Sequence, residues 1–272
     1  MFYGIQHIGY LVADLDQAVA WFGTAFGAVN AGGTEMKDSP MVPGGGVNAF
    51  VRFGTVEVEL MQPADASALP KGALVMHHIG FITDDIAGAA AKARANGLKM
   101  LVDAPYTNVM GQKVHYLDPT TTNGVWMHLT EVPDRNRQPV GDGRGVVTSI
   151  VHPGLLVRDL DASIAWYVEK LDGVHVGGGP RALGGRIAFV NCGDAQVELI
   201  EPDEVSRPSE PQRLDHVGYE VAGLDEVVPL YEGRGLSFDP PEVRVNPIGQ
   251  RLIYFATTAS LGARMHLTEL PR

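Results

Sequence analysis

The chain has 272 residues, of which 45% are hydrophobic, and a formal net charge of −11 at pH 7. Because it carries no run of basic residues, this acidic balance excludes nucleic acid and anionic membrane surfaces as main partners. No stretch of the sequence is long and apolar enough to span a bilayer. Cys192 is the single cysteine, so no internal disulfide can form. With an N-terminus that lacks a signal-peptide layout, these features predict a cytoplasmic protein.

The first quarter of the chain predicts one helix among several strands. Asp14 is a good helix N-cap, apolar residues follow it at helical spacing, and Gly27 ends the helix. Residues 32–46 are rich in glycine and proline and predict a loop. Segments rich in β-branched and aromatic residues predict strands at 6–12, 48–53 and 56–61.

The later quarters repeat this plan. Helical patterns are expected at residues 85–95, 160–171 and 224–233, the last containing Pro229. Strands in the second quarter are expected at residues 77–83, 99–102, 113–117 and 125–131. Residues 134–145 are polar and loop-like, and we interpret them as a linker.

An internal duplication relates the two halves of the chain. Met127-His-Leu-Thr-Glu131 returns almost unchanged as Met265-His-Leu-Thr-Glu269, about half the chain later. Further matched segments are 7–16 with 152–161, 58–63 with 197–202, and 78–81 with 216–219. The sequence therefore predicts two tandem domains, residues 1–133 and 146–272, joined by residues 134–145.

Each half contains two strand–helix–strands modules, so we expect an α+β fold of four βαβββ modules. The sheets should be curved and mainly antiparallel, with the helices outside them. One such module is too small to bury both faces of its sheet, so modules must pair. The sequence leaves open whether they pair within each half, or first with fourth and second with third.

Four repeat-matched positions carry potential metal ligands in each half. Six of the nine histidines form repeat-matched pairs, and one glutamate pair matches as well: His7/His152, Glu59/Glu198, His78/His216 and His128/His266. All eight lie on predicted strands, and imidazole with carboxylate is a ligand mix for zinc, iron, manganese, nickel or cobalt. A single histidine on a strand is as readily explained as a packed core residue as it is as a metal ligand. Two complete sets are harder to explain by packing alone.

Strand parity separates these histidines from the glutamates that follow them. In a regular strand His128 shares a face with Trp126 and Thr130, whereas Glu131 points to the other face. The same holds for Glu269 in the second half. We expect both glutamates to face solvent or to form local ion pairs.

The layout resembles the vicinal oxygen chelate superfamily, and within it the branch of methylmalonyl-CoA epimerase and glyoxalase I. The motifs that carry the resemblance are His7-Ile-Gly-Tyr-Leu-Val-Ala-Asp-Leu-Asp, Phe53-Gly-Thr-Val-Glu-Val-Glu-Leu-Met-Gln-Pro and His78-Ile-Gly-Phe-Ile-Thr-Asp-Asp. The resemblance implies that paired modules surround one divalent metal. It implies the ligands His7, Glu59, His78 and His128 in one half, and His152, Glu198, His216 and His266 in the other.

One departure from that branch affects the expected reaction. There the last ligand is a glutamate in a Gly-x-x-hydrophobic-Glu pattern, but Gly124-Val-Trp-Met-His128 and Gly262-Ala-Arg-Met-His266 place histidine there. We therefore do not assign glyoxalase or epimerase activity outright. The leading hypothesis is a metal-dependent isomerase, epimerase or lyase that chelates neighbouring oxygens of a small carbonyl or enolisable substrate. Glu59 or Glu198, or Glu57 beside the former, would take the proton.

Two alternatives remain open. One is an extradiol-type ring-cleaving dioxygenase that uses iron(II) or manganese(II). The other is a non-catalytic resistance protein that binds a small molecule, although such proteins typically lack the ligands. The matched Tyr116 and Tyr254 are candidates to line the cleft, whereas His115 has no counterpart in the second half. A small-molecule substrate is the expected partner, and a homodimer is one option for assembly.

Overall fold

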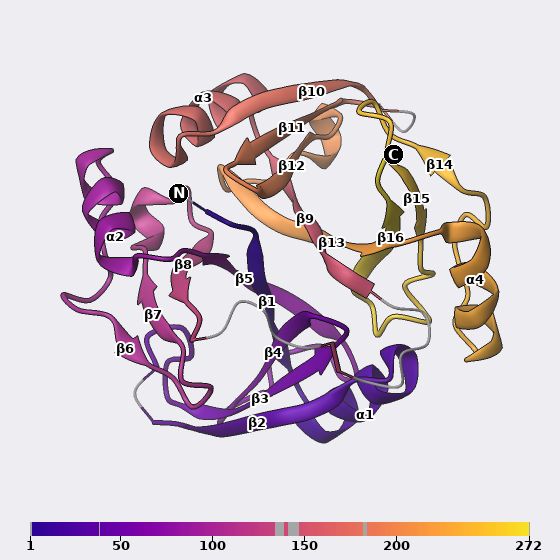
Figure 1. Ribbon diagram of the computed structural model, residues 1–272, viewed down its shortest axis with the longest axis horizontal. Helices are drawn as coiled ribbons and strands as arrows, with labels where there is room; N and C mark the ends of the chain where they lie inside the picture. Colours follow the sequence, from indigo (N-terminus) through magenta and orange to yellow (C-terminus); the bar gives the residue numbers. More distant parts are fainter. Residues whose placement is uncertain (1, 38, 134–138, 141–146, 182–183, 272) are drawn as a thin grey trace. The chain divides into compact units, whose positions relative to one another are not determined.

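The computed structural model describes residues 2–37, 39–133, 139–140, 147–181 and 184–271 (Figure 1). Its α-helices are α1 (Leu15–Phe26), α2 (Ile86–Ala95), α3 (Leu160–Leu171) and α4 (Leu224–Gly233), with short 3-10 helices η1 (Pro119–Thr121) and η2 (Glu204–Ser206). The side chain of Asp14 caps α1 by accepting from the amide of Gln17, as the sequence predicts. None of the described helices is long and apolar enough to cross a membrane.

The strands of the described residues are β1 (Ile5–Val12), β2 (Val29–Met36), β3 (Gly46–Phe53), β4 (Val56–Pro63), β5 (Leu74–Ile82), β6 (Tyr106–Thr107), β7 (Lys113–Tyr116), β8 (Trp126–Glu131), β9 (Val147–Val157), β10 (Val174–Pro180), β11 (Arg186–Cys192), β12 (Ala195–Glu201), β13 (Gln212–Val221), β14 (Arg244–Val245), β15 (Arg251–Tyr254) and β16 (Arg264–Glu269). They form two sheets of eight, in the orders β2-β3-β4-β1-β5-β8-β7-β6 and β10-β11-β12-β9-β13-β16-β15-β14. Most pairs are antiparallel, while β1/β4, β5/β8 and β9/β12 are parallel. The predicted α+β fold of four βαβββ modules is confirmed.

Two local predictions were wrong. Residues 32–46 were expected to form a loop, but β2 runs as far as Met36 at the edge of its sheet. Its mostly exposed, glycine-containing sequence gives little of the apolar pattern that indicates a strand. Residues 99–102 were expected to form a strand, but only Met100 makes an isolated bridge, to Leu117.

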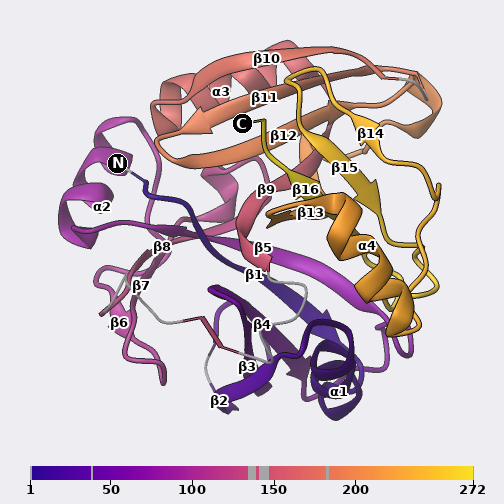
Figure 2. The same ribbon diagram turned by 45° about the vertical axis from the view of Figure 1, so that its right-hand side comes forward.

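Each helix packs on strands of its own module, as expected for helices outside the sheets. Thus α1 lies against β3 and β4, α2 against β7 and β8, α3 against β10 to β12, and α4 against β15 and β16. Figure 2 shows β10, β11 and β12 running side by side with α3 behind them. The side chains on the opposite faces of these strands are therefore not covered by the helices.

Packing divides the chain into two compact units, each discontinuous in sequence. Unit 1 comprises residues 1–6, 78–133 and 151–216, and unit 2 comprises residues 7–77, 134–150 and 217–272. Unit 1 therefore contains most of the second and third modules, and unit 2 most of the first and fourth. The domain boundaries predicted from the repeat remain a prediction. The predicted linker lies mostly outside the described residues, although Val140 pairs with Gly54.

An aromatic cluster forms the core of unit 2. The ring of Phe26 at the end of α1 lies 4.6 Å from Phe53, 5.5 Å from Tyr231 and 5.9 Å from Phe255. The indole of Trp21 donates to the carbonyl of Ala259 at 3.0 Å. Burial of aromatic rings is a large apolar contribution, so these contacts explain why the first module packs with the fourth.

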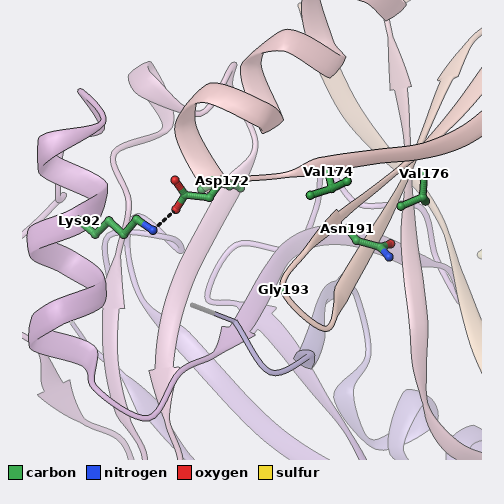
Figure 3. Close-up of a pocket in the computed structure, with 7 residues that line it drawn as sticks. Lys92, Asp172, Val174, Val176, Asn191 and Gly193 are labelled. Atoms are coloured by element: carbon green, nitrogen blue, oxygen red, sulfur yellow. Dashed lines mark ion pairs between the residues drawn. The ribbon is translucent and has the colours of Figure 1, made fainter.

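Polar contacts join the second and third modules in unit 1. Lys92 of α2 pairs with Asp172 at the end of α3 at 2.5 Å, and Asn96 donates to the carbonyl of Lys170 at 3.0 Å. A pocket of about 430 Å³ lies beside the Lys92–Asp172 pair (Figure 3). Figure 3 shows Asn191 of β11 among its lining residues. This pocket is open to the surface and is not an enclosed cavity.

Candidate metal centre

Three predicted ligands of the second half converge on one point inside unit 1. The Nε2 atoms of His152 on β9 and His216 on β13 lie 3.1 Å and 3.0 Å from the same oxygen, Oε2 of Glu198 on β12. All three side chains are buried, and each offers a ligand atom within 4.8 Å of the others. Two imidazole nitrogens and a carboxylate oxygen at this spacing can hold a divalent cation.

The protonation of this cluster follows from its hydrogen bonds. Burial alone would lower the pKa of His216, but its hydrogen bonds to Asp215 and Glu198 outweigh burial and raise the pKa to about 9. Burial would raise the pKa of Glu198, but hydrogen bonds from His152 and His216 hold it well below its usual range. Glu198 is therefore an anion, as a metal ligand must be.

An outer hydrogen bond orients His216. Its Nδ1 donates to Oδ2 of Asp215 at 3.0 Å, which leaves Nε2 directed at Glu198. A carboxylate behind an imidazole fixes the ring and raises its basicity, an arrangement common around metal-binding histidines. The sequence analysis did not select Asp215, although its position directly before His216 could have drawn attention to it.

Glycines make room for two of the histidines in unit 1. A Cβ on Gly154 would lie 2.0 Å from Cε1 of His216, and a Cβ on Gly80 would lie 2.5 Å from Cε1 of His128. Both contacts are shorter than real Cβ contacts allow, so each glycine permits a close approach of backbone and ring. The residues present, including these spaces, fit a metal centre.

The first half has a related arrangement in unit 2, with different contacts. Nε2 of His7 on β1 lies 3.4 Å from Oε2 of Glu59 on β4, and both side chains are buried. The other oxygen of Glu59 accepts a 2.6 Å hydrogen bond from Nδ2 of Asn48 on β3. Asn48 is a residue that the sequence analysis missed, since a single asparagine on a strand carries no motif.

The remaining predicted ligands are three buried histidines, His78, His128 and His266, of which the last two have hydroxyl partners. In unit 1, His78 and His128 have ring centroids 5.3 Å apart, and Nδ1 of His128 lies 2.8 Å from Oγ1 of Thr130. In unit 2, Nδ1 of His266 lies 2.7 Å from Oγ1 of Thr268. With Nδ1 held by a hydroxyl, Nε2 of each ring is the nitrogen that would bind a metal ion.

The matched tyrosines pack against these two histidines. The ring of Tyr116 lies 5.1 Å from that of His128, and the ring of Tyr254 lies 4.8 Å from that of His266. His115, next to Tyr116, is buried and bonds through Nε2 to the carbonyl of Val102 at 2.9 Å. Because strand neighbours face opposite ways, His115 belongs to the other face of β7.

Glu131 and Glu269 form local ion pairs at helix N-termini, one of the two outcomes expected. Glu131 accepts from the amide of Ile86 at the start of α2 at 3.1 Å and pairs with Lys113. Lys113 and then the Ile86 amide lower the pKa of Glu131. Glu269 accepts from the amide of Leu224 at 3.1 Å and from Arg251 at 2.6 Å. Both glutamates point away from the histidine three positions earlier in their strands, as parity predicts.

Cys192 packs inside unit 1. It is fully buried on β11, and burial, with the nearby Asp172 charge, raises the pKa of its thiol to about 12. A thiol that stays protonated is a poor nucleophile and a poor metal ligand. Cys192 therefore has a packing role in this environment.

The four-module fold and the buried histidine and carboxylate donors are those of a vicinal-oxygen-chelate type of protein. The sequence pattern of the Glyoxalase/Bleomycin resistance protein/Dioxygenase superfamily matches residues 6–116 and 151–255. The chain belongs to this superfamily, whose members include metal-dependent enzymes.

Individual relatives differ in function. Mitochondrial methylmalonyl-CoA epimerase from Bos taurus is 25% identical over 134 residues, which cover 47% of this chain and 73% of the epimerase. The Mn(II)-bound glyoxalase from Novosphingobium aromaticivorans has a TM-score of 0.71 at 15% identity, covering 98% of this chain and 82% of the glyoxalase. A mutant 4-hydroxymandelate synthase from Streptomyces coelicolor has a TM-score of 0.70 at 15% identity, covering 99% and 93%. At these identities the structural likeness shows the fold alone.

Proposed function

We propose that this chain is a divalent-metal-dependent enzyme that chelates two neighbouring oxygens of a small carbonyl or enolisable substrate, with an isomerase, epimerase or lyase reaction. The observation that carries the proposal is the convergence of His152 and His216 on one oxygen of Glu198. Charged and polar groups this deeply buried need a reason, and a resident cation supplies one.

The proposed ligands follow the repeat. His152, Glu198, His216 and His266 would form the second site, and His7, Glu59, His78 and His128 the first site. Iron, manganese, zinc, nickel and cobalt all suit these donors. When bound, such an ion supplies a Lewis acid that stabilises negative charge on the chelated oxygens.

In this proposal a carboxylate of the chain takes the proton next to the chelated carbonyl. The candidates are Glu59 and Glu198, together with Glu57, which is buried and shares a face of β4 with Glu59. The matching position in the second half is Gln196, which cannot accept a proton. The first half therefore offers one more proton acceptor than the second. Tyr116 and Tyr254 would pack beside the substrate.

A second candidate function rests on the same cluster. Two histidines and one carboxylate, as in His152, His216 and Glu198, are the donor set of non-haem iron(II) oxygenases. An extradiol-type dioxygenase that uses iron(II) or manganese(II) is therefore the alternative. A non-catalytic resistance protein is disfavoured because both halves retain buried donors.

One comparison separates these functions. Protein purified with and without exclusion of air is analysed for metal content, and each sample is then assayed in two ways. Metal-dependent exchange of the α-protons of carbonyl compounds in D₂O, followed by NMR, supports the leading proposal. Iron-dependent oxygen uptake with catechols selects the dioxygenase. Metal-free protein that binds a large aromatic compound tightly selects the resistance function. A cytoplasmic location and a homodimer remain proposals for fractionation and sedimentation experiments.

A further inference from the structure

We propose that the two sites bind metal with unequal affinity, the second more tightly, and that the matched positions Asn48 and Ile187 set much of the difference. The inference rests on the proposed function in that it presupposes a resident divalent ion. It goes further by assigning opposite effects to two residues that are not themselves ligands.

The two positions are equivalent in the fold. Asn48 lies two residues before the cross-strand partner of Glu59 in the hairpin of β3 and β4. Ile187 lies two residues before the cross-strand partner of Glu198 in the hairpin of β11 and β12. Both therefore share a sheet face with the glutamate of their own hairpin. The first half therefore has an amide side chain at this position, and the second half has a hydrocarbon side chain.

Asn48 is fixed in the orientation that binds Glu59. Its Oδ1 accepts from the backbone amide of Thr34 at 2.8 Å, so its Nδ2 is directed at Oε1 of Glu59, 2.6 Å away. Asn48 is itself buried. The hydrogen bond engages one of the two carboxylate oxygens, and it draws electron density from the group. A metal ion at the first site must therefore bind a carboxylate that is partly engaged elsewhere.

Glu198 meets no such competitor at the matched position, because the side chain of Ile187 cannot donate a hydrogen bond. Its Oε2 already lies within 3.1 Å of both histidine nitrogens, against 3.4 Å between Glu59 and His7. Ligands that are already gathered lose less conformational freedom when the ion binds.

The residue that precedes the histidine ligand also differs between the halves, and this difference too favours the second site. Asp215 holds Nδ1 of His216 in the second half, and the residue that precedes the matching His78 is His77. A carboxylate behind an imidazole strengthens it as a ligand, and position 77 carries no acidic residue. Both differences favour the second site, and an outer partner of a histidine ligand such as Asp215 typically changes metal affinity by about 10- to 100-fold.

The test measures metal affinity directly, in the full chain, by titrating Zn²⁺ or Co²⁺ alone against a coloured chelator. His152→Ala/His216→Ala isolates the first site, and His7→Ala/His78→Ala isolates the second. In these backgrounds Asn48→Ile should tighten the first site about tenfold, because it removes a hydrogen bond to the charged carboxylate that competes with the ion, and Ile187→Asn should weaken the second about tenfold by adding one. Asn191→Ile, on β11 beside Gln196, is the matched control and should change neither affinity.

The outcomes separate this inference from the proposed function. No metal binding by the folded wild-type chain would overturn both. Two sites of equal affinity, or weaker binding at the first site after Asn48→Ile, would overturn only the inference. Asn48→Ala removes the same donor with less added bulk. If circular dichroism shows that Asn48→Ile is unfolded, the alanine variant decides the result by the same criterion.

Discussion

Glu59 and Glu198 hold the same position in the two halves of the chain, yet they have different neighbours. Glu59 is engaged by Asn48 on one oxygen and lies 3.4 Å from His7 on the other. Glu198 receives two histidines on a single oxygen, at 3.0 Å and 3.1 Å. The duplication has kept the predicted ligands in both halves, whereas the residues that orient them have diverged. Strand pairing fixes the backbone position of each predicted ligand. The neighbouring side chains then determine how its carboxylate is oriented and which groups it contacts.

The largest effect should come from removing a ligand itself. Metal analysis of purified wild-type chain should find up to two divalent ions. Alanine in place of His7, His78, His152 or His216 should each lower that content, because an imidazole ligand has no substitute in the buried site. Full metal retention by all four variants would show that these histidines are packed core residues.

The next effect concerns the histidines of the last strand in each half. His128→Ala and His266→Ala should weaken metal binding about tenfold or more if the contact is direct. Chelator competition measures this loss. Thr130 and Thr268 hold Nδ1 of these rings at 2.8 Å and 2.7 Å, so Nε2 is the nitrogen removed from the site. Unchanged affinity in both variants would remove these histidines from the ligand sets.

A smaller effect should separate the two halves through Asp215. Asp215→Asn keeps the shape of the side chain but removes the charge behind His216. Affinity at the second site should fall about tenfold, the low end for outer partners of a metal ligand, while the first site is unaffected. Titrating the two isolated sites checks the expected loss at the second site and the unchanged affinity at the first. An equal loss at the two sites would point to a general loss of structure.

Much of the fold could be predicted from the sequence because it is repetitive. Each repeated motif marks a strand, and Asp14 marks a helix start by a local rule. Strand β2 was missed because its exposed sequence lacks an apolar face. The pairing of modules was left open because it depends on the fit of side chains far apart in sequence, such as Phe26 and Tyr231.

The candidate site divides in a similar way. The candidate ligands could be chosen from the repeat, and strand parity separated His128 from Glu131. The orienting residues could not be chosen, because Asn48 and Asp215 act through single contacts that depend on side-chain geometry. Those residues do not repeat either, since Ile187 and His77 occupy the matching positions. A search for repeated residues passes over the features that distinguish the two halves.

The smallest effect should come from the glutamates on the opposite strand face. Glu131→Gln and Glu269→Gln should leave metal content unchanged, because each carboxylate bonds to a helix N-terminus and a cation instead. Each substitution should lower the free energy of unfolding by about 1 kcal/mol, since a partly exposed ion pair and one helix-end charge each contribute modestly. Loss of metal in either variant would place the glutamate in the metal centre and refute the parity argument.

The pH dependence of that stability offers a sharper test at Glu131. Lys113 and the Ile86 amide lower its pKa in the folded chain below the usual 4.5. Folding therefore favours the ionised form, so its stabilising contribution is present above pH 4.5 and disappears as pH falls through the lowered pKa. Urea unfolding should find wild type more stable than Glu131→Gln at neutral pH, with the difference vanishing in acid. A difference that stays constant on acidification would mean that the carboxylate charge is not what stabilises the start of α2.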